Sequence, residues 1–470
     1  MPDLTRFYHR LPYPLRVAAA SAKGYYLRWW RYGPETERLA EEALERETWT
    51  SPQWKSWQEE RLALLLHRAR HQVPYYRAYW DERERRGERG AWQYLENWPI
   101  LRKEAVRAQP RAFLADDCSA RRMYHDHTSG TTGTPLSLWF SRETLQRWYA
   151  LFEARLRRWH GVTIYERWGI FGGQRVVPFE QKTPPFWVEN YGLNQVYFSV
   201  LHVAPWSTEA YLHALQRFQL THLIVYPSSL YFLAGEVLET HRNFPIPSKL
   251  RVIFANAEPL YPFQREKIQL VFGCPVRETY GQAERVCAAS ECEAGHMHVW
   301  PEVGYIEILD DETRPVRPGE IGRLIATGLL NFDMPLIRYE VGDMVMNLAS
   351  SGGEPCACGR YLPRLGNVLG RNDDVIRTRD GRKIVQIDTI YAPEYHIKES
   401  QIIQESLDKF RIKVVPAEGW SKENGDALRQ ALQERVGKVQ VEVEIVDSIE
   451  RTWAGKFRVI ISRMPIDSDV

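Results

Sequence analysis

The chain has 470 residues, of which 44% are hydrophobic, and its 62 basic and 60 acidic residues give a formal net charge of +2. This length provides for more than one hydrophobic core, and the near-neutral charge does not favour nucleic acid as a partner. No apolar run approaches the roughly 20 residues that span a bilayer, and the first 20 residues lack the apolar core of a secretory signal. We therefore expect a cytoplasmic globular protein, and the sequence leaves its oligomeric state open.

Residues 1 to about 120 are predicted to be mainly helical. Residues 35–47 and 57–71 show helical spacing of Leu and Ala with charged opposite faces, and the segment at 73–76 ends the second helix at Pro74. Near the start, Tyr25, Tyr26, Trp29 and Trp30 stand among Lys23, Arg28 and Arg31. Such a mixture can dock on a membrane surface, but aromatics more often pack on their own domain. Peripheral membrane contact is therefore not our first expectation.

A run of glycine and hydroxyl residues comes next. It reads Thr128-Ser129-Gly130-Thr131-Thr132-Gly133-Thr134-Pro135, between a predicted short strand at 121–124 and a predicted helix at 144–160. Glycines let the backbone turn tightly and approach a ligand, and hydroxyls and freed amides can surround phosphate oxygens. A strand, such a loop and a helix together form a plausible phosphate cradle. The loop lacks the Gly-Lys-Ser/Thr of a Walker motif, and an ordinary polar loop is the alternative.

Residues 160–345 begin with alternating strands and helices. Strands are predicted at 167–171, 223–226 and 252–255, and helices at 210–218, 230–240 and 262–272. Near-continuous apolar strands between helices predict a sheet covered on both faces. Ligands of such sheets lie beyond the carboxyl ends of the strands. Candidate residues follow those ends, at 171–173, Tyr226, 256–258 and 280–284.

From Tyr305 the pattern changes to alternating strands, at 305–309 and 323–326, which predicts a small antiparallel sheet or barrel. Residues 370–374 then read as a linker, followed by a helix at 428–436 and an alternating strand at 439–446. The predicted class is thus α/β. A large N-terminal domain of residues 1–370 contains covered sheets and a small barrel-like part, and a small mobile α+β domain occupies residues 371–470.

Five segments in a fixed order carry a resemblance to a known family. The loop at 128–135 is followed by Tyr280-Gly281-Gln282-Ala283-Glu284, Arg338-Tyr339-Glu340-Val341-Gly342-Asp343, Gly370-Arg371-Asn372-Asp373-Asp374 and Arg451-Thr452-Trp453-Ala454-Gly455-Lys456. Together they resemble the adenylate-forming enzymes, in particular the branch of phenylacetate–coenzyme A ligases and CapK-like proteins. Thr134 stands where many members carry lysine, so one phosphate contact of the family is not carried over. The branch is diverse, and the resemblance does not name the acid.

The resemblance implies an ATP-dependent ligase that makes an acyl-adenylate from a carboxylic acid and transfers the acyl group. Coenzyme A is the expected acceptor and the acid is often aromatic. An amine or sugar acceptor, as in polysaccharide or secondary metabolism, and a non-catalytic nucleotide-binding relative are the alternatives. A non-catalytic relative has no need to keep Glu284, Asp343 and Lys456, all of which are present.

The same resemblance assigns roles to individual residues. Thr128 to Thr134 would hold the β- and γ-phosphates, and Glu284 would ligate Mg²⁺, a hard cation that prefers carboxylate oxygen. Tyr280 and Gly281 would lie at the adenine, whose edge Asn256, Ala257 and Glu258 would line. Asp343 could accept hydrogen bonds from both ribose hydroxyls, with Arg371 as a second ribose or phosphate contact. Lys456 would neutralise the carboxylate–phosphate junction as a movable point charge, and Asp373 matches the family's hinge.

The six cysteines of this long chain do not read as a disulfide framework. Cys356-Ala357-Cys358-Gly359 is a compact knuckle, and Cys292 and His298 stand together upstream. One Cys and one His from one loop and two Cys from another supply four zinc ligands, and some members of the branch have a similar site. We predict a structural zinc on Cys292, His298, Cys356 and Cys358, with His296 and Cys287 as competing ligands. Cys118 and Cys274 are expected to be buried small hydrophobes.

Overall fold

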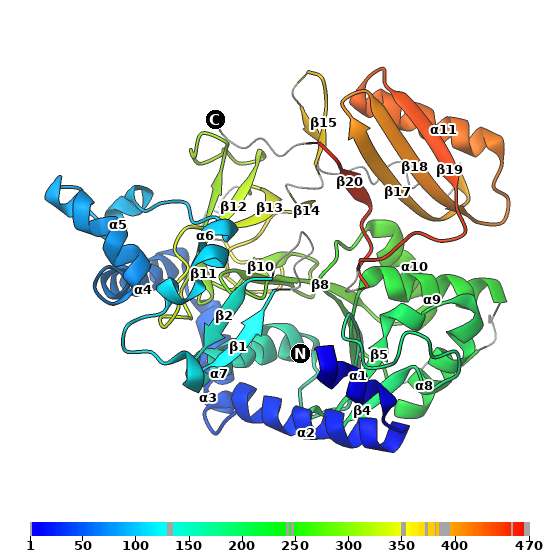
Figure 1. Cartoon of the computed structure of the whole chain (residues 1–470), viewed down its shortest axis with the longest axis horizontal. Coiled ribbons are helices and arrows are strands. Elements are labelled where there is room, and N and C mark those ends of the chain that lie inside the picture. The colour runs from blue at the N-terminus through cyan, green and yellow to red at the C-terminus, as the bar shows by residue number, and fades with distance from the viewer. Residues whose placement is uncertain are drawn as a thin grey trace.

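The structure, a computed structural model, describes residues 2–128, 135–240, 244–245, 249–348, 354–371, 375–380, 382–384, 395–452 and 455–464. The predictions for Ser129 to Thr134 and for Asp373 lie outside the described residues. Figure 1 shows helices of the first hundred residues along one side and the lower edge of the molecule. It also shows a central sheet flanked by helices, a second sheet above it, and a C-terminal sheet and helix at the upper right.

The N-terminal part is helical, as predicted. Its helices are α1 (Pro2–Arg10), α2 (Tyr13–Arg31), α3 (Thr36–Glu45), α4 (Ser51–Gln72), α5 (Pro74–Arg85) and α6 (Lys103–Ala108). Helix α4 ends before Pro74, as expected, but Pro74 also begins α5. Proline suits the first position of a helix because its missing N–H would have no helical partner there.

The exposed aromatics of α2 correct one expectation. Trp30 is buried, with 8% of its surface exposed, but Tyr25, Tyr26 and Trp29 are 59%, 47% and 53% exposed. Packing on the protein's own core therefore accounts for Trp30 and not for the other three. Among the described residues, no helix is both long enough and apolar enough to cross a bilayer.

The glycine- and hydroxyl-rich loop joins two strands rather than a strand and a helix. The predicted strand at 121–124 is wrong: residues 120–122 form a 3₁₀ turn, and the strand β1 is Tyr124–His127. It pairs antiparallel with β2 (Ser137–Phe140), which places His125 opposite Trp139. Their rings stack 5.0 Å apart. The chain then enters α7 (Arg142–Phe152), which continues as π- and 3₁₀-helical turns to His160 and thus covers the predicted helix.

An eight-stranded sheet forms the centre, in the order β10-β9-β8-β7-β6-β3-β5-β4. Its strands are β3 (Trp168–Gly172), β4 (Trp187–Asn190), β5 (Gln195–Ser199), β6 (His222–Val225), β7 (Val252–Ala255), β8 (Val276–Gly281), β9 (Ala288–Glu291) and β10 (Met297–Val299). Strands β5, β3, β6, β7 and β8 are parallel neighbours. The crossover helices are α8 (Thr208–Phe218), α9 (Pro227–Thr240) and α10 (Pro262–Phe272).

Both faces of this sheet are covered, as the apolar strands predicted. In β7, Ile253 packs in the core shared with α8, α9 and α10, and Phe254 packs in the opposite core with α3 and α7. Successive strand residues point to opposite faces, so a doubly covered strand is apolar along most of its length rather than at alternate positions. The carboxyl ends of the parallel strands consequently meet at one edge, where a ligand site forms.

A second, antiparallel sheet follows, as predicted from residue 305 onward. It consists of β11 (Gly304–Leu309), β12 (Ile321–Gly328), β13 (Tyr339–Met346) and β14 (Val368–Arg371), in that order. Tyr339 at the start of β13 is fully buried in the core that this sheet shares with α4.

The C-terminal part has a separate hydrophobic core. Strands β17 (Ile397–Ser406), β18 (Lys409–Pro416), β19 (Gln440–Ile445) and β20 (Ile460–Ser462) form one sheet, and α11 (Lys422–Val436) packs on it. A short hairpin of β15 (Ile376–Arg377) and β16 (Lys383–Ile384) precedes them. The sheet is mixed, because β18 pairs parallel with β19 and antiparallel with β17. This is the α+β arrangement expected for the small domain, whose boundary at residue 371 stays a prediction.

Candidate active site

Two of the five sequence segments meet directly. Tyr280, near the end of β8, donates a hydrogen bond from its Oη to Oδ2 of Asp343 on β13, at 2.6 Å. Burial and the neighbouring Asp343 carboxylate raise the pKa of Tyr280 well above its ordinary value, so the phenol remains a donor. Asp343 also lies opposite Arg371 in the pairing of β13 with β14. The structure thereby brings together the residues expected at adenine and ribose.

Glu284 lies four residues beyond Tyr280 and is 5% exposed. Tyr339 donates a hydrogen bond from its Oη to Oε1 of Glu284, at 2.7 Å. No further hydrogen bond or ion pair reaches this carboxylate from the described part of the chain. Oε2 is therefore the oxygen that could ligate a cation, and the tyrosine holds the other in place. The sequence did not indicate this tyrosine as a partner.

The base of the glycine- and hydroxyl-rich loop is closed by Thr128. Its Oγ1 accepts a hydrogen bond from the backbone N of Leu136, and its own backbone N donates to the carbonyl of Leu136. Arg285, next to Glu284, reaches Asp126 on β1 in an ion pair of 2.9 Å. The loop's starting strand is thus tied to the segment that carries Tyr280 and Glu284.

Lys456 is brought to the carboxyl end of β6. Its ammonium lies 5.9 Å from the ring centroid of Tyr226, the residue that follows this strand. The lysine closes a turn: the backbone N of Thr452 donates to the carbonyl of Lys456, and the backbone N of Lys456 donates to Oγ1 of Thr452. Gly455 in that turn has a φ of +76°, and a Cβ there would meet a methyl carbon of Val200 at 2.5 Å. Only glycine fits both this backbone angle and this close approach.

The carboxylate of Glu258 holds that turn against the large domain. Its Oε1 accepts a hydrogen bond from the backbone N of Phe457 at 2.6 Å, and its Oε2 accepts one from the backbone N of Ser228 at 3.1 Å. Burial raises the pKa of Glu258, and these two backbone donors oppose the rise. The resemblance placed Glu258 at the edge of the adenine, and in the structure its carboxylate contacts the main chain of the small domain and of α9. Asn256 and Ala257 are the other two residues expected at that edge. The backbone of Ala257 is left-handed, with a φ of +66°.

A second contact joins the two domains further out. Lys398 of β17 forms an ion pair of 2.7 Å with Glu239 near the end of α9. Figure 1 shows the red coil that leads into β20 passing between the end of the central sheet and the small domain. The two contacts therefore hold the small domain over the edge where the parallel strands end.

The four predicted zinc ligands converge. One ligand atom from each of Cys292, His298, Cys356 and Cys358 lies within 4.8 Å of every other. The His298 ring bonds through Nδ1 to the carbonyl of Leu362 at 3.0 Å, which leaves Nε2 facing Cys358 at 3.5 Å. A backbone partner on the other nitrogen is how zinc-bound histidines are usually oriented.

The chemistry of this donor set fits zinc. Burial lowers the pKa of His298 to about 4, so the imidazole is neutral and able to ligate at pH 7. Three sulfurs and one nitrogen are the donor types that bind zinc in closed, structural sites. Of the competing residues, His296 approaches Cys356 through Nδ1 at 3.3 Å, whereas Cys287 is buried near Asp343, which helps raise its pKa.

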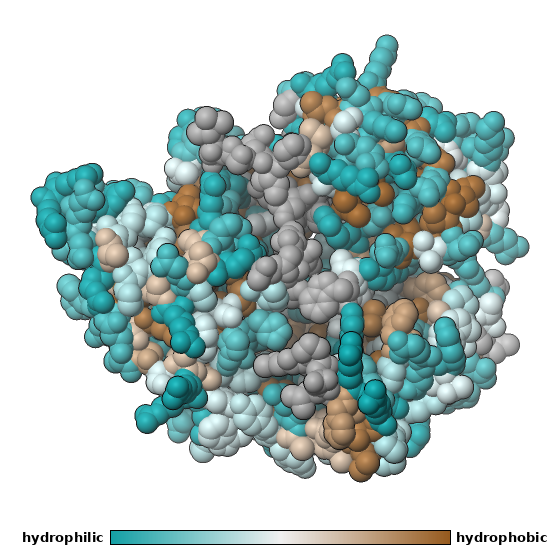
Figure 2. Space-filling model, in the orientation of Figure 1, coloured by the Kyte–Doolittle hydropathy of each residue, from teal (hydrophilic) through white to brown (hydrophobic). Residues whose placement is uncertain are grey.

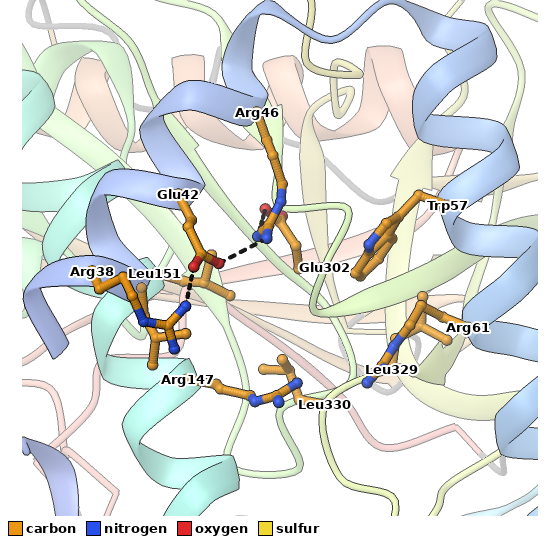
Figure 3. A pocket seen from close by; sticks show the side chains of 11 residues that line it. Arg38, Glu42, Arg46, Trp57, Arg61, Arg147, Leu151, Glu302, Leu329 and Leu330 are labelled. Carbon is orange, nitrogen blue, oxygen red and sulfur yellow. Dashed lines mark hydrogen bonds and ion pairs between the residues drawn. The ribbon is translucent and has the colours of Figure 1, made fainter. Parts of the chain in front are cut away.

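A cavity of about 230 Å³ lies elsewhere, between α3, α4 and α7, and none of the five sequence segments lines it. Figure 3 shows Glu42 there between Arg38 and Arg46, with ion pairs to both. Glu302 is held by the buried Arg155, with one contact of 2.7 Å. Because none of the residues expected at the nucleotide lines this cavity, we do not assign the nucleotide to it.

Two family models match the chain in succession. The model described as "AMP-binding enzyme" matches residues 186–333, and the model described as "CapK C-terminal domain" matches residues 376–463. The first covers most of the central sheet and the Tyr280–Glu284 segment. The second covers the small domain, including Lys456.

Two relatives match over most of their own length. The chain is 27% identical to protein CapK of Staphylococcus aureus over 342 residues, which cover 72% of this chain and 74% of that protein. It is 26% identical to phenylacetate-coenzyme A ligase of Thermus thermophilus over 444 residues, which cover 87% of this chain and 92% of that ligase.

Solved structures share the fold. A 2-hydroxyisobutyryl-CoA ligase in its postadenylation state superposes with a TM-score of 0.68 at 20% identity, covering 89% of this chain and 91% of that one. The same ligase in its thioesterification state covers the same shares and scores 0.55 at 21% identity.

Proposed function

We propose that this chain, which carries an AMP-binding enzyme domain and a CapK C-terminal domain, is an AMP-forming carboxylate ligase. The observation that carries the proposal is the position of Lys456. The Glu258–Phe457 contact brings this lysine from the small domain to the edge of the large domain's sheet. Two hydrogen bonds, from Tyr280 to Asp343 and from Tyr339 to Glu284, join the segment at the end of β8 to β13.

In the first half-reaction, a carboxylate oxygen of the acid attacks the α-phosphorus of ATP, and the bond to the bridging oxygen breaks to release pyrophosphate. Negative charge spreads over the phosphoryl oxygens in such a transition state, and preorganised cations stabilise it. Lys456 supplies one such cation. The loop at Thr128 to Thr134 would hold the β- and γ-phosphates, and Asp343 with Arg371 would orient the ribose.

Magnesium fits the carboxylate of Glu284. Tyr339 occupies one oxygen of this buried group and leaves the second for a hard cation, which prefers oxygen ligands shared with phosphate. Bound there, the ion would neutralise phosphate charge. Structural zinc fits Cys292, His298, Cys356 and Cys358, and would tie the loop after β9 to the knuckle at 356–358.

In the second half-reaction, a nucleophile attacks the acyl carbonyl and AMP leaves. We assign coenzyme A as the acceptor, on the similarity to phenylacetate-coenzyme A ligase of Thermus thermophilus, and an organic acid, such as an aromatic one, as the donor. Both ATP and coenzyme A are abundant in the cytoplasm, where we place the reaction. An amine or sugar acceptor, the alternative drawn from the resemblance to CapK-like proteins, is the second candidate.

Pyrophosphate release, measured over a panel of carboxylic acids with and without coenzyme A, tests the proposal. We expect release with one class of acid, and a thioester with AMP once coenzyme A is added. Turnover that needs an amine or a sugar in place of coenzyme A would select the second candidate. ATP binding without pyrophosphate release for any acid would show a non-catalytic nucleotide-binding protein instead.

A further inference from the structure

Helix α2 presents a row of apolar residues to solvent, whereas its polar residues Arg16 and Ser21 are buried against the protein. The residues exposed along one side of the helix are Leu15, Ala18, Ala19, Ala22, Tyr25, Tyr26 and Trp29. They recur three or four positions apart, so they share one face. A surface helix of a globular protein ordinarily has the opposite arrangement. Figure 2 shows the apolar surface over the first half of α2 in brown at the lower edge of the molecule.

The inward face of α2 is fixed by specific contacts, so the helix cannot simply rotate to bury its apolar side. Gly24 packs so closely that a Cβ there would meet Oδ1 of Asn190 at 1.8 Å. Ser21 accepts a hydrogen bond from the backbone N of Tyr191 at 3.1 Å. The buried Arg16 donates to Oε1 of Gln181 at 3.3 Å. Rotation of the helix would break these contacts and would bury side chains where glycine is required.

Basic side chains flank the apolar face. Lys23 and Arg28 are exposed on α2. From α7, Arg142 lies 4.3 Å from the ring centroid of Trp29. The segment at 1–34 holds six basic residues and one acidic residue, Asp3, whereas the whole chain is almost neutral. The face is therefore apolar at its centre and positive at its margin.

We propose that this face of α2 binds the surface of an anionic lipid bilayer. Helices that lie in a membrane interface combine an apolar face containing aromatic residues with flanking Lys and Arg. Tyr and Trp favour the level of the lipid headgroups, and acidic headgroups complement the basic margin. A second copy of this chain is a poorer occupant. In a symmetric contact the same patch would face itself and bring Lys23, Arg28 and Arg142 against their own counterparts.

The bilayer would lie next to a loop that starts at the catalytic edge. His9 of α1, which precedes α2, bonds through Nε2 to the carbonyl of Arg175 at 2.7 Å. Arg175 follows shortly after Gly172, the end of β3. The contact with lipid is nevertheless independent of the proposed function, because none of the residues assigned to ATP lies on α2.

Cosedimentation of the full chain with vesicles tests the proposal. We expect binding to vesicles of phosphatidylcholine with phosphatidylglycerol, weak binding to phosphatidylcholine alone, and release by salt, which screens the basic margin. Replacing two aromatics in the variant Tyr26→Ser with Trp29→Ser should weaken binding roughly tenfold or more. The variant Lys23→Glu with Arg28→Glu should abolish the preference for the anionic vesicles.

Leu270→Ser is the matched control for Leu15→Ser, since both leucines are exposed on helices, at 72% and 53%. Only Leu15→Ser should weaken vesicle binding, and neither variant should change the melting temperature appreciably. Failure to bind anionic vesicles, or an equal loss with Leu270→Ser, would overturn the proposal. A dimer in sedimentation that the α2 variants dissociate, without any vesicle binding, would identify a second copy as the occupant instead.

Discussion

The backbone N of Phe457 donates a hydrogen bond of 2.6 Å to Oε1 of Glu258, a contact between residues 199 positions apart. Phe457 directly follows Lys456, so the contact sets the position of the proposed catalytic lysine. Burial disfavours the charged form of Glu258, and two backbone N–H donors offset part of that penalty. A carboxylate of the large domain thus recognises the main chain of the small domain rather than one of its side chains.

Removing this carboxylate should uncouple the two domains. We expect Glu258→Ala to slow adenylate formation about tenfold to a hundredfold, the scale of a lost charge-assisted hydrogen bond, with a smaller effect on ATP affinity. Single-turnover release of pyrophosphate measures the step. Glu239→Ala, which removes the partly exposed ion pair with Lys398, is the control and should have little effect. Equal rates for Glu258→Ala and the wild type would exclude the contact from the adenylate-forming state.

Lys456→Ala should slow adenylate formation far more than it weakens ATP binding, because the ammonium makes its main contact in the transition state. The barrier should rise by several kcal/mol, on the scale of about 3–4 kcal/mol for one preorganised donor. Transfer from a chemically supplied acyl-adenylate should survive. Lys422→Ala, at the exposed start of α11, is the control. If both half-reactions fall equally in Lys456→Ala, the model in which the lysine serves one of two domain positions is wrong.

Asp343→Ala should weaken ATP binding by about 1–3 kcal/mol, because the ribose hydroxyls lose an ionised acceptor. Tyr280→Phe keeps the ring and removes only the hydroxyl that bonds Asp343, so its loss should be nearer 1 kcal/mol. Calorimetric titration with ATP measures both. An unchanged affinity in Asp343→Ala would show that the ribose lies elsewhere.

One zinc ion per chain is expected in protein purified without chelator. Cys356→Ser should lower the metal content and the melting temperature together, because metal binding contributes to folding free energy. Cys274→Ser is the control, since Cys274 is also buried but lies outside the four-residue cluster. Elemental analysis of the purified protein decides the question, and a zinc-free wild type would refute the assignment.

Glu278 should make stability depend on pH. Burial, reinforced by the neighbouring Glu291, raises the pKa of Glu278 from 4.5 to about 7, so the folded chain favours the neutral form. This contribution to the free energy of unfolding is complete below pH 4.5 and is lost as the pH rises to about 7. It amounts to at most about 3 kcal/mol. Denaturant unfolding of Glu278→Gln across this pH range should show a smaller fall in the free energy of unfolding than the wild type shows. An identical fall in both proteins would mean that other groups titrate.

The sequence alone determined the local features. Periodicity and the chain breaks at Gly and Pro predict the apolar strands β6 and β7 and the helices α8 to α11. The spacing of ligand types predicts the three cysteines and one histidine of the zinc site. The sequence failed at 121–124, where a 3₁₀ turn replaces the predicted strand, because four residues carry too little periodicity to separate the two. The order of the five segments indicated which residues would gather, but not how.

Only the tertiary structure decided the partners. Contacts between distant positions decide three features. Tyr339 bonds Glu284, Glu258 bonds the main chain at Phe457, and α2 exposes its apolar face. Helical spacing shows that Leu15, Ala22 and Trp29 share one side of α2, yet it does not show which side meets the protein. That choice was made by Gly24, Ser21 and Arg16 packing against residues 181–192. Such complementarity depends on two surfaces at once, and a single stretch of sequence describes only one of them.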